Sequence, residues 1–184
     1  MDDFLSIQIF CCHLGSCGPV NSMGGTMQAL TGTQHGDAAN NLLAFYVDRV
    51  NELEQSGQYF MAAIALAFAL ETSILTFLLV EFGDDNGGEL EVPSSVGMSD
   101  LIEAANCFDV LNAPIDVPSH SSEDDAHPKH VAKDAADKIR RFRKLIHPAR
   151  ALMESYDPRT FTLKDLEEYK EMYNSVTHSL LYFL

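Results

Sequence analysis

From residue 37 onward, apolar side chains recur every three or four positions, which is the spacing of one face of a helix. The first such segment begins near Asp37, a residue suited to an N-cap, and closes at Ser56-Gly57. Its apolar face consists of Leu42, Leu43, Tyr46, Val47, Val50 and Leu53. A second, almost uninterrupted apolar segment covers residues 58–82 and ends at the sequence GDDNGG. The short connection between the two segments predicts an antiparallel pair of helices.

Helical spacing returns three more times after that pair. Ser99 is placed to cap a short helix, which is followed by an exposed loop over 113–128 that contains three prolines. A helix is expected from about Pro128 to Ile146, where Pro148 stops or bends it. Thr162 and Asp165 resemble a capping box that opens a last helix ending near Leu181.

These segments predict an all-α protein, a helical bundle of four main helices plus a short helix. The length of 184 residues suits one domain. We expect residues 37–184 to form the helical bundle domain. Residues 1–36 are rich in Gly, Ser, Thr, Met and Cys without a sustained period, which favours an irregular N-terminal arm.

The charge of this acidic protein is unevenly distributed. The whole chain has a net charge of -15, which on average repels nucleic acid and anionic lipid. Residues 129–150 nevertheless hold eight basic residues against two acidic ones, whereas residues 1–128 hold one basic residue against 19 acidic ones. Any site for an anion is therefore expected in or near the 129–150 segment.

The apolar segment over Tyr59–Val80 is long enough to span a bilayer as a helix. Against that interpretation, Glu71 would lie at the membrane centre and both flanks are acidic. We therefore expect a buried core helix and no membrane partner, with a basic side chain from residues 138–150 paired to Glu71. No basic residue precedes Arg49, so no secretory signal is expected and a cytoplasmic location is favoured.

Metal-ligating and cofactor-binding motifs give little support to a resident cofactor. Cys11, Cys12, His13 and Cys17 offer thiolate and imidazole groups, but their spacing matches no zinc finger or ribbon. His120, His127 and His130 lie in or beside the acidic loop and are expected to be solvated. No P-loop, GxGxxG or GxSxG pattern occurs. We expect no cofactor and no bound metal.

The candidate chemistry lies in the string KIRRFRKLIHP, residues 138–148. On a continuous helix, Arg140 and Arg143 point within about 20° and 40° of His147, whereas Arg141 points about 120° away. A histidine can move the proton of a 2'-hydroxyl while guanidinium groups hold the phosphate, which is the chemistry of metal-independent RNA cleavage. The same spacing also suits a solvated basic face that pairs with acids elsewhere in the fold.

Three stretches, in order, resemble the HEPN-like domain family. RRFRKLIHPAR is similar to its Arg-rich segment ending in His-Pro, AAIALAFALETSILTFLL to its Ala-rich second helix, and MSDLIEAANCFDVLN to its L-x-D-L-I-E-x-A segment. The resemblance covers roughly residues 40–150. It implies a helical bundle that usually forms a homodimer, with ribonuclease activity in many members of toxin, antiphage or RNA-processing systems.

The resemblance implies catalytic roles for His147, Arg140 and Arg143. We expect Arg141, Lys144 and Lys138 to bind the RNA substrate. The family pattern places four to six residues between Arg and His, which Arg140 and Arg141 satisfy and Arg143 does not. Active members often have a polar residue directly after the Arg, where this chain has Arg141 and Lys144.

Two functions therefore remain open. The first is a HEPN-type endoribonuclease or RNA-directed protein, which could have a protein partner in a conflict system. The second is a non-catalytic interaction or dimerisation module. For the homodimer we expect the basic helix to lie at or beside the interface. The last helix, with Tyr169, Met172, Tyr173 and Val176, is the expected source of apolar dimer contacts, while Phe142, Ile139 and Ile146 are expected in the core.

Overall fold

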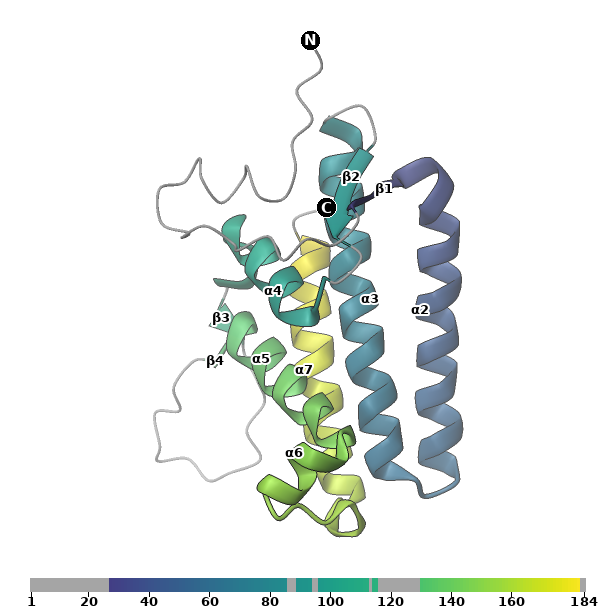
Figure 1. Ribbon diagram of the computed structural model, residues 1–184, viewed down its shortest axis with the longest axis vertical. Coiled ribbons are helices and arrows are strands. Elements are labelled where there is room, and N and C mark those ends of the chain that lie inside the picture. The colour runs from purple at the N-terminus through teal and green to yellow at the C-terminus, as the bar shows by residue number, and fades with distance from the viewer. Residues whose placement is uncertain (1–26, 86–88, 94–95, 113, 116–129, 183–184) are drawn as a thin grey trace.

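The computed structural model describes residues 27–85, 89–93, 96–112, 114–115 and 130–182 (Figure 1). Helices dominate this part of the chain, and the predicted all-α class is confirmed. The α-helices are α2 (Gly32–Gln55), α3 (Tyr59–Asp85), α4 (Met98–Cys107), α5 (Ala132–Arg143), α6 (Pro148–Met153) and α7 (Leu163–Tyr182). Two short antiparallel ribbons accompany them: β1 (Met27–Thr31) with β2 (Glu89–Pro93), and β3 (Pro114–Ile115) with β4 (His130–Val131).

Helix α3 forms the centre of the bundle, with α2 and α7 alongside it and α4 and α5 packed against the same core (Figure 1). Helices α2 and α3 make the expected antiparallel pair, joined by a turn in which Gly57 has φ of +73°. That left-handed conformation suits glycine because it has no Cβ. Ala62, Ala63, Ala67 and Ala69 are fully buried, so the small side chains of α3 allow close approach of its neighbours.

The core has two parts. The aliphatic cluster lies where α3, α4, α5 and α7 meet, and its largest fully buried side chains are Leu70, Ile74, Leu78, Leu101, Ile102, Val110, Leu111, Ile139 and Val176. The aromatic cluster lies at the other end of α5 and consists of Phe60, Phe142, Tyr156, Phe161 and Tyr169, whose rings contact one another. Burial of the second apolar segment is thus confirmed.

Several expected boundaries are wrong. Helix α2 begins at Gly32 rather than near Asp37, and residues 27–31 of the expected arm form a strand. Gly97, not Ser99, is the N-cap of α4, and its N–H donates to Asp100 Oδ2 at 2.9 Å. Helix α5 begins at Ala132 and ends at Arg143 rather than running from Pro128 to Ile146, and α6 is a separate short helix that begins at Pro148.

The capping box at the last helix is confirmed. The Thr162 N–H and hydroxyl both donate to Asp165 Oδ2, at 2.8 and 2.6 Å, and α7 follows at once. The expectations for Cys11, Cys12, His13, Cys17, His120 and His127 lie outside the described residues. His130 belongs to β4. Among the described residues, no group of three or more His, Cys, Asp or Glu side chains is arranged to hold a metal ion.

Candidate functional site

The basic segment folds as a helix, a turn and a second helix. Helix α5 ends at Arg143, residues Lys144–Ile146 form a 3₁₀ turn, and His147 is extended with φ of -79° and ψ of 121°. Pro148 then occupies the first position of α6. A residue before proline avoids the helical region, and proline suits the first turn of a helix because its missing N–H is not needed there. Pro148 therefore redirects the chain, as expected.

This turn breaks the common face expected for Arg140, Arg143 and His147. The 100° step per residue holds only within α5, and the 3₁₀ turn and the extended His147 change the direction of every side chain after Arg143. His147 is exposed, and its backbone N–H donates to the Lys144 carbonyl at 3.1 Å. The expected continuous helix to Ile146 is thus wrong, and Ile146 is 41% exposed rather than in the core.

Arg143 turns inward toward α3. Its guanidinium donates a hydrogen bond to Glu71 Oε2 and lies 4.2 Å from the centre of the Phe68 ring. A cation over an aromatic face is attracted by the negative ring face. The expectation that Glu71 finds a basic partner from residues 138–150 is therefore confirmed, and Arg143 serves this structural ion pair.

The other cations of α5 and the 3₁₀ turn differ in exposure and in their partners. Arg140 Nε donates to Asp137 Oδ1 at 2.8 Å, and Lys138 Nζ donates to Glu168 Oε1 at 2.5 Å. Arg141 and Lys144 are exposed, and none of the ion pairs between described residues includes either of them. These two cations are therefore available to an external anion.

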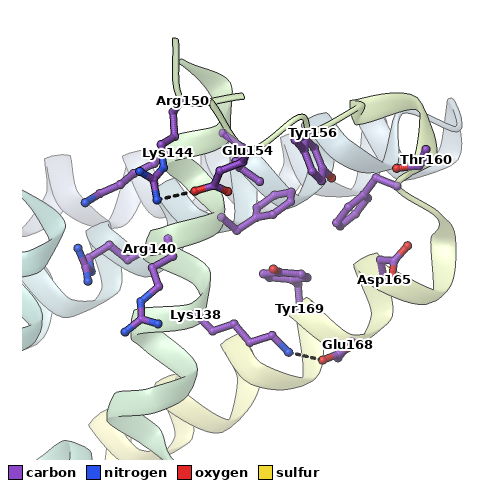
Figure 2. A pocket seen from close by; sticks show the side chains of 14 residues that line it. Lys138, Arg140, Lys144, Arg150, Glu154, Tyr156, Thr160, Asp165, Glu168 and Tyr169 are labelled. Atoms are coloured by element: carbon purple, nitrogen blue, oxygen red, sulfur yellow. Dashed lines mark hydrogen bonds and ion pairs between the residues drawn. The ribbon is translucent and has the colours of Figure 1, made fainter. Parts of the chain in front are cut away.

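These cations border a groove of about 850 Å³ between α5, α6 and the start of α7 (Figure 2). That volume is in the range of ligand-binding clefts, 300–1,000 Å³. Lys138, Arg140, Arg141, Lys144 and Arg150 supply its positive charge. Figure 2 shows Arg140, Lys144 and Arg150 toward one end of the groove and Asp165 and Thr160 toward the other, with Tyr156 and Tyr169 between them. The ammonium of Lys138 reaches Glu168 of α7 near Tyr169.

The aromatic cluster forms the apolar part of the groove. Phe142 is 5% exposed, and its ring centre lies 4.7 Å from that of Tyr169 and 5.0 Å from that of Phe161. Tyr156 and Phe161 are half-buried and line the groove. Burial and the nearby carboxylate of Glu168 raise the pKa of Tyr169 to about 12. The pKa of Tyr156 is raised by burial and then by Asp165 and Asp157. Both phenols are therefore neutral at physiological pH.

A Schellman motif brings Tyr156 to the groove. The Tyr156 N–H donates to the Ala151 carbonyl at 2.9 Å and the Ser155 N–H to the Leu152 carbonyl at 3.1 Å. Ser155 has φ of +51°, the left-handed conformation that ends many helices. The chain reverses here, so that the segment after α6 returns along the groove to α7.

The groove unites three of the expected substrate-binding residues, Lys138, Arg141 and Lys144, with the expected catalytic Arg140. It does not include Arg143 or His147 in its lining. His147 lies in the sequence between two residues that do line it, Lys144 and Arg150, and its carbonyl accepts the Arg150 N–H at 3.0 Å.

Sequence reasoning missed the second wall of the groove. Arg150, Tyr156, Phe161, Asp165 and Tyr169 come from α6, the following loop and α7. The expected role of α7 in dimer contacts is wrong for its buried face: Met172 and Val176 are 8% and 0% exposed, and Tyr169 and Tyr173 pack on the core. The sequence contains one indication of this wall: two aromatic residues, Tyr156 and Phe161, follow shortly after the basic segment.

Comparison with models of protein families, with curated proteins and with solved structures finds no match for this chain. Function is therefore inferred from the residues of the groove. Among the described residues, one helix, Tyr59–Glu81, is long and apolar enough to cross a membrane, and 67% of its most apolar window is buried inside the bundle. A core helix of a bundle has the same property.

Proposed function

We propose that this protein is an RNA-directed, HEPN-like helical protein that binds the phosphates of single-stranded RNA in the groove between α5, α6 and α7. The observation that carries the proposal is the pair of exposed cations, Arg141 and Lys144, bordering an aromatic groove in a protein whose net charge is -15. An acidic protein repels RNA in general, so binding depends on such a local concentration of positive charge.

The combination of cations and aromatic rings favours RNA over a simple anion. Proteins that bind single strands combine a basic groove for the backbone with aromatic side chains on which bases stack. Here Tyr156 and Phe161 line the same groove as Arg141, Lys144 and Arg150. Arg150 already pairs with Glu154, so Arg141 and Lys144 are the cations that gain most from binding phosphate.

We further propose that His147 transfers a proton during metal-independent cleavage of the bound RNA. His147 is exposed and lies between Lys144 and Arg150 in the sequence, beside the cationic end of the groove. Its extended backbone before Pro148 takes it off the helical face of α5, and it lies outside the groove lining, so its role requires RNA that extends past the groove to His147. Arg140 is then the arginine that holds the phosphate, because it lines the groove and Arg143 does not, and it does so while its Nε also pairs with Asp137.

Binding is tested with a fluorescent single-stranded RNA and the double variant Arg141→Ala/Lys144→Ala. Losing two charge-assisted phosphate contacts is expected to weaken binding roughly tenfold or more. The control Arg49→Ala/Lys164→Ala removes the same charge from exposed positions outside the groove and is expected to bind within about twofold of wild type. Equal weakening by both double variants would contradict a specific groove.

Cleavage is tested in EDTA with His147→Ala, with His178→Ala, an exposed histidine of α7, as the control. Removing a general acid or base typically costs about 100-fold or more in rate. Full activity in His147→Ala would contradict its role. Binding without cleavage in the wild-type protein would leave an RNA-binding protein and reject the nuclease.

The alternative, a non-catalytic interaction module, is favoured by one specific observation: Arg143 is bound to Glu71, and His147 does not line the groove. For either function we propose that two copies associate, as the family resemblance implies. Leu152 and Met153 on α6 are 79% and 77% exposed and replace α7 as the source of apolar contacts. Light scattering of Leu152→Asp/Met153→Asp against wild type tests this: a monomeric mass for wild type at every concentration rejects the dimer.

A further inference from the structure

The two ends of the groove differ in chemistry. The α5 and α6 side carries Arg141, Lys144 and Arg150, whereas the α7 side carries carboxylates beside the aromatic cluster. A pure phosphate-binding groove gains nothing from carboxylates, which repel phosphate. The α7 end is therefore suited to a different part of the same ligand.

Three carboxylates line the groove, and two of them are neutralised. Glu154 pairs with Arg150, and Glu168 pairs with Lys138. Asp165 is the third, and no salt bridge between described residues includes it. Its Oδ2 accepts both hydrogen bonds from Thr162, and none of the hydrogen bonds between described residues uses its Oδ1. Asp165 thus keeps one oxygen for a ligand that donates a hydrogen bond.

Asp165 is also close to the aromatic rings. It lines the same groove as Tyr156 and Tyr169, and its charge contributes to raising the pKa of both phenols. Figure 2 shows Asp165 at the end of the groove opposite Lys144, next to the space bordered by the two tyrosines. Tyr156 and Phe161 are half-buried in the same lining, so each keeps ring surface on which a flat base can stack near this carboxylate.

We infer that the groove seats one unpaired nucleotide of the RNA, with its phosphate at Arg141 and Lys144, its base on Tyr156 and Phe161, and a base amino group donating to Asp165. This inference rests on the proposed RNA binding and adds a base preference to it. A carboxylate accepts a hydrogen bond from the exocyclic amine of cytosine, whereas uracil has at that position a carbonyl oxygen, which the carboxylate repels, and keeps only its N3–H as a donor. The groove therefore selects amino-bearing bases over uracil.

The test compares fluorescent oligocytidine and oligouridine of equal length, because these pyrimidines differ only at C4 and N3 of the ring and have similar shape. Wild type is expected to bind oligocytidine about fivefold or more tightly than oligouridine. Asp165→Asn offers uracil an N–H donor and lacks the charge that repels it, so its two affinities should fall within about twofold of each other. Asn also keeps a side-chain oxygen for Thr162, and circular dichroism checks that α7 remains folded.

Glu167→Gln is the matched control, because Glu167 is an exposed carboxylate of the same helix that does not line the groove. It should strengthen binding of both oligomers slightly and leave their ratio unchanged. Equal wild-type affinities, with both oligomers still weakened by Arg141→Ala/Lys144→Ala, would overturn the base seat and leave the proposed RNA binding standing. An unchanged preference in Asp165→Asn would overturn the role of Asp165. No binding of either oligomer would overturn the proposed function itself.

Discussion

The aliphatic and aromatic clusters share α3, α5 and α7 but differ in what surrounds them. In the aliphatic cluster, Leu70, Ile74 and Ile139 are fully buried, and four helices close around them. In the aromatic cluster, Phe142 is buried while Tyr156 and Phe161 remain half-buried beside the groove. One helix, α5, thus contributes Ile139 to a closed core and, three residues later, Phe142 to the base of a ligand-sized groove.

The difference indicates a division of tasks. Aliphatic side chains fill a closed core efficiently and leave no surface for a ligand. Aromatic side chains contribute to the core and also present flat faces that stack on other rings. We therefore expect substitutions in the aliphatic cluster to change stability and those around the groove to change binding.

The largest effect is expected from Ile74→Ala. Ile74 is 0% exposed, so truncation removes its buried surface and leaves a cavity, at a cost of about 2–5 kcal/mol in the free energy of unfolding. Ile74→Val should cost only about 0.5–1.5 kcal/mol. Urea unfolding measures both. RNA affinity of the folded fraction should stay at the wild-type value, and a loss of affinity in proportion to stability would contradict the division of tasks.

The next largest effect on stability is expected from breaking the ion pair between Arg143 and Glu71. The side chains of Arg143 and Glu71 are 28% and 22% exposed, so Glu71→Gln leaves a largely buried guanidinium without its counter-ion. After allowance for this partial exposure, we expect a loss of about 1–3 kcal/mol in the free energy of unfolding. Glu52→Gln breaks the exposed pair with Arg49 and should cost less than about 0.5 kcal/mol. Equal losses from the two variants would contradict a structural role for Arg143.

Tyr156→Ala tests whether an aromatic residue of the groove contributes to RNA affinity. Stacking of one base on an aromatic ring is worth about 1–3 kcal/mol, so RNA affinity should fall by a factor of about 5 to 150. Tyr46→Ala removes a tyrosine stacked on Phe68 on another side of α3 and should leave RNA affinity unchanged. Fluorescence anisotropy measures both variants. An equal fall in affinity would show that lost stability, rather than stacking, explains the result.

The smallest effect is expected in the pH dependence of stability, through Asp165 at the start of α7. Hydrogen bonds from the Thr162 side chain, and then from its backbone, lower the pKa of Asp165 below its usual 3.8. The ionised form is therefore stabilised by folding, a contribution that is complete above about pH 4 to 5 and is lost as the pH falls through the lowered pKa. Wild type should be slightly more stable than Asp165→Asn at pH 7, with the difference vanishing in acid. A difference that grows toward low pH would contradict the assignment.

The sequence predicted the helices better than the site because helices depend on local periodicity. The buried second helix, the capping box at Thr162 and a basic partner for Glu71 all follow from spacing or from the cost of burying a lone charge. The face shared by Arg140, Arg143 and His147 was wrong because it assumed a straight helix through a 3₁₀ turn and an extended residue.

The second wall of the groove depends on tertiary contacts that periodicity does not reveal. Phe142 lies on α5 and Asp165 on α7. The chain reversal at Ser155 allows both residues to line the same groove. The exposed apolar residues show the same limit: Leu42 fits the apolar spacing of α2, yet it is 46% exposed because the partners of that helix lie on one side only.

The most direct test of the account is the salt dependence of RNA binding by wild type and by Arg141→Ala/Lys144→Ala. Each phosphate contact with single-stranded RNA contributes about 0.7 to the slope of the logarithm of affinity against the logarithm of salt concentration. If Arg141 and Lys144 each hold a phosphate, the slope of the double variant should be shallower by about 1.4. Parallel slopes for the two proteins would show that these cations do not contact RNA and would contradict the groove as its binding site.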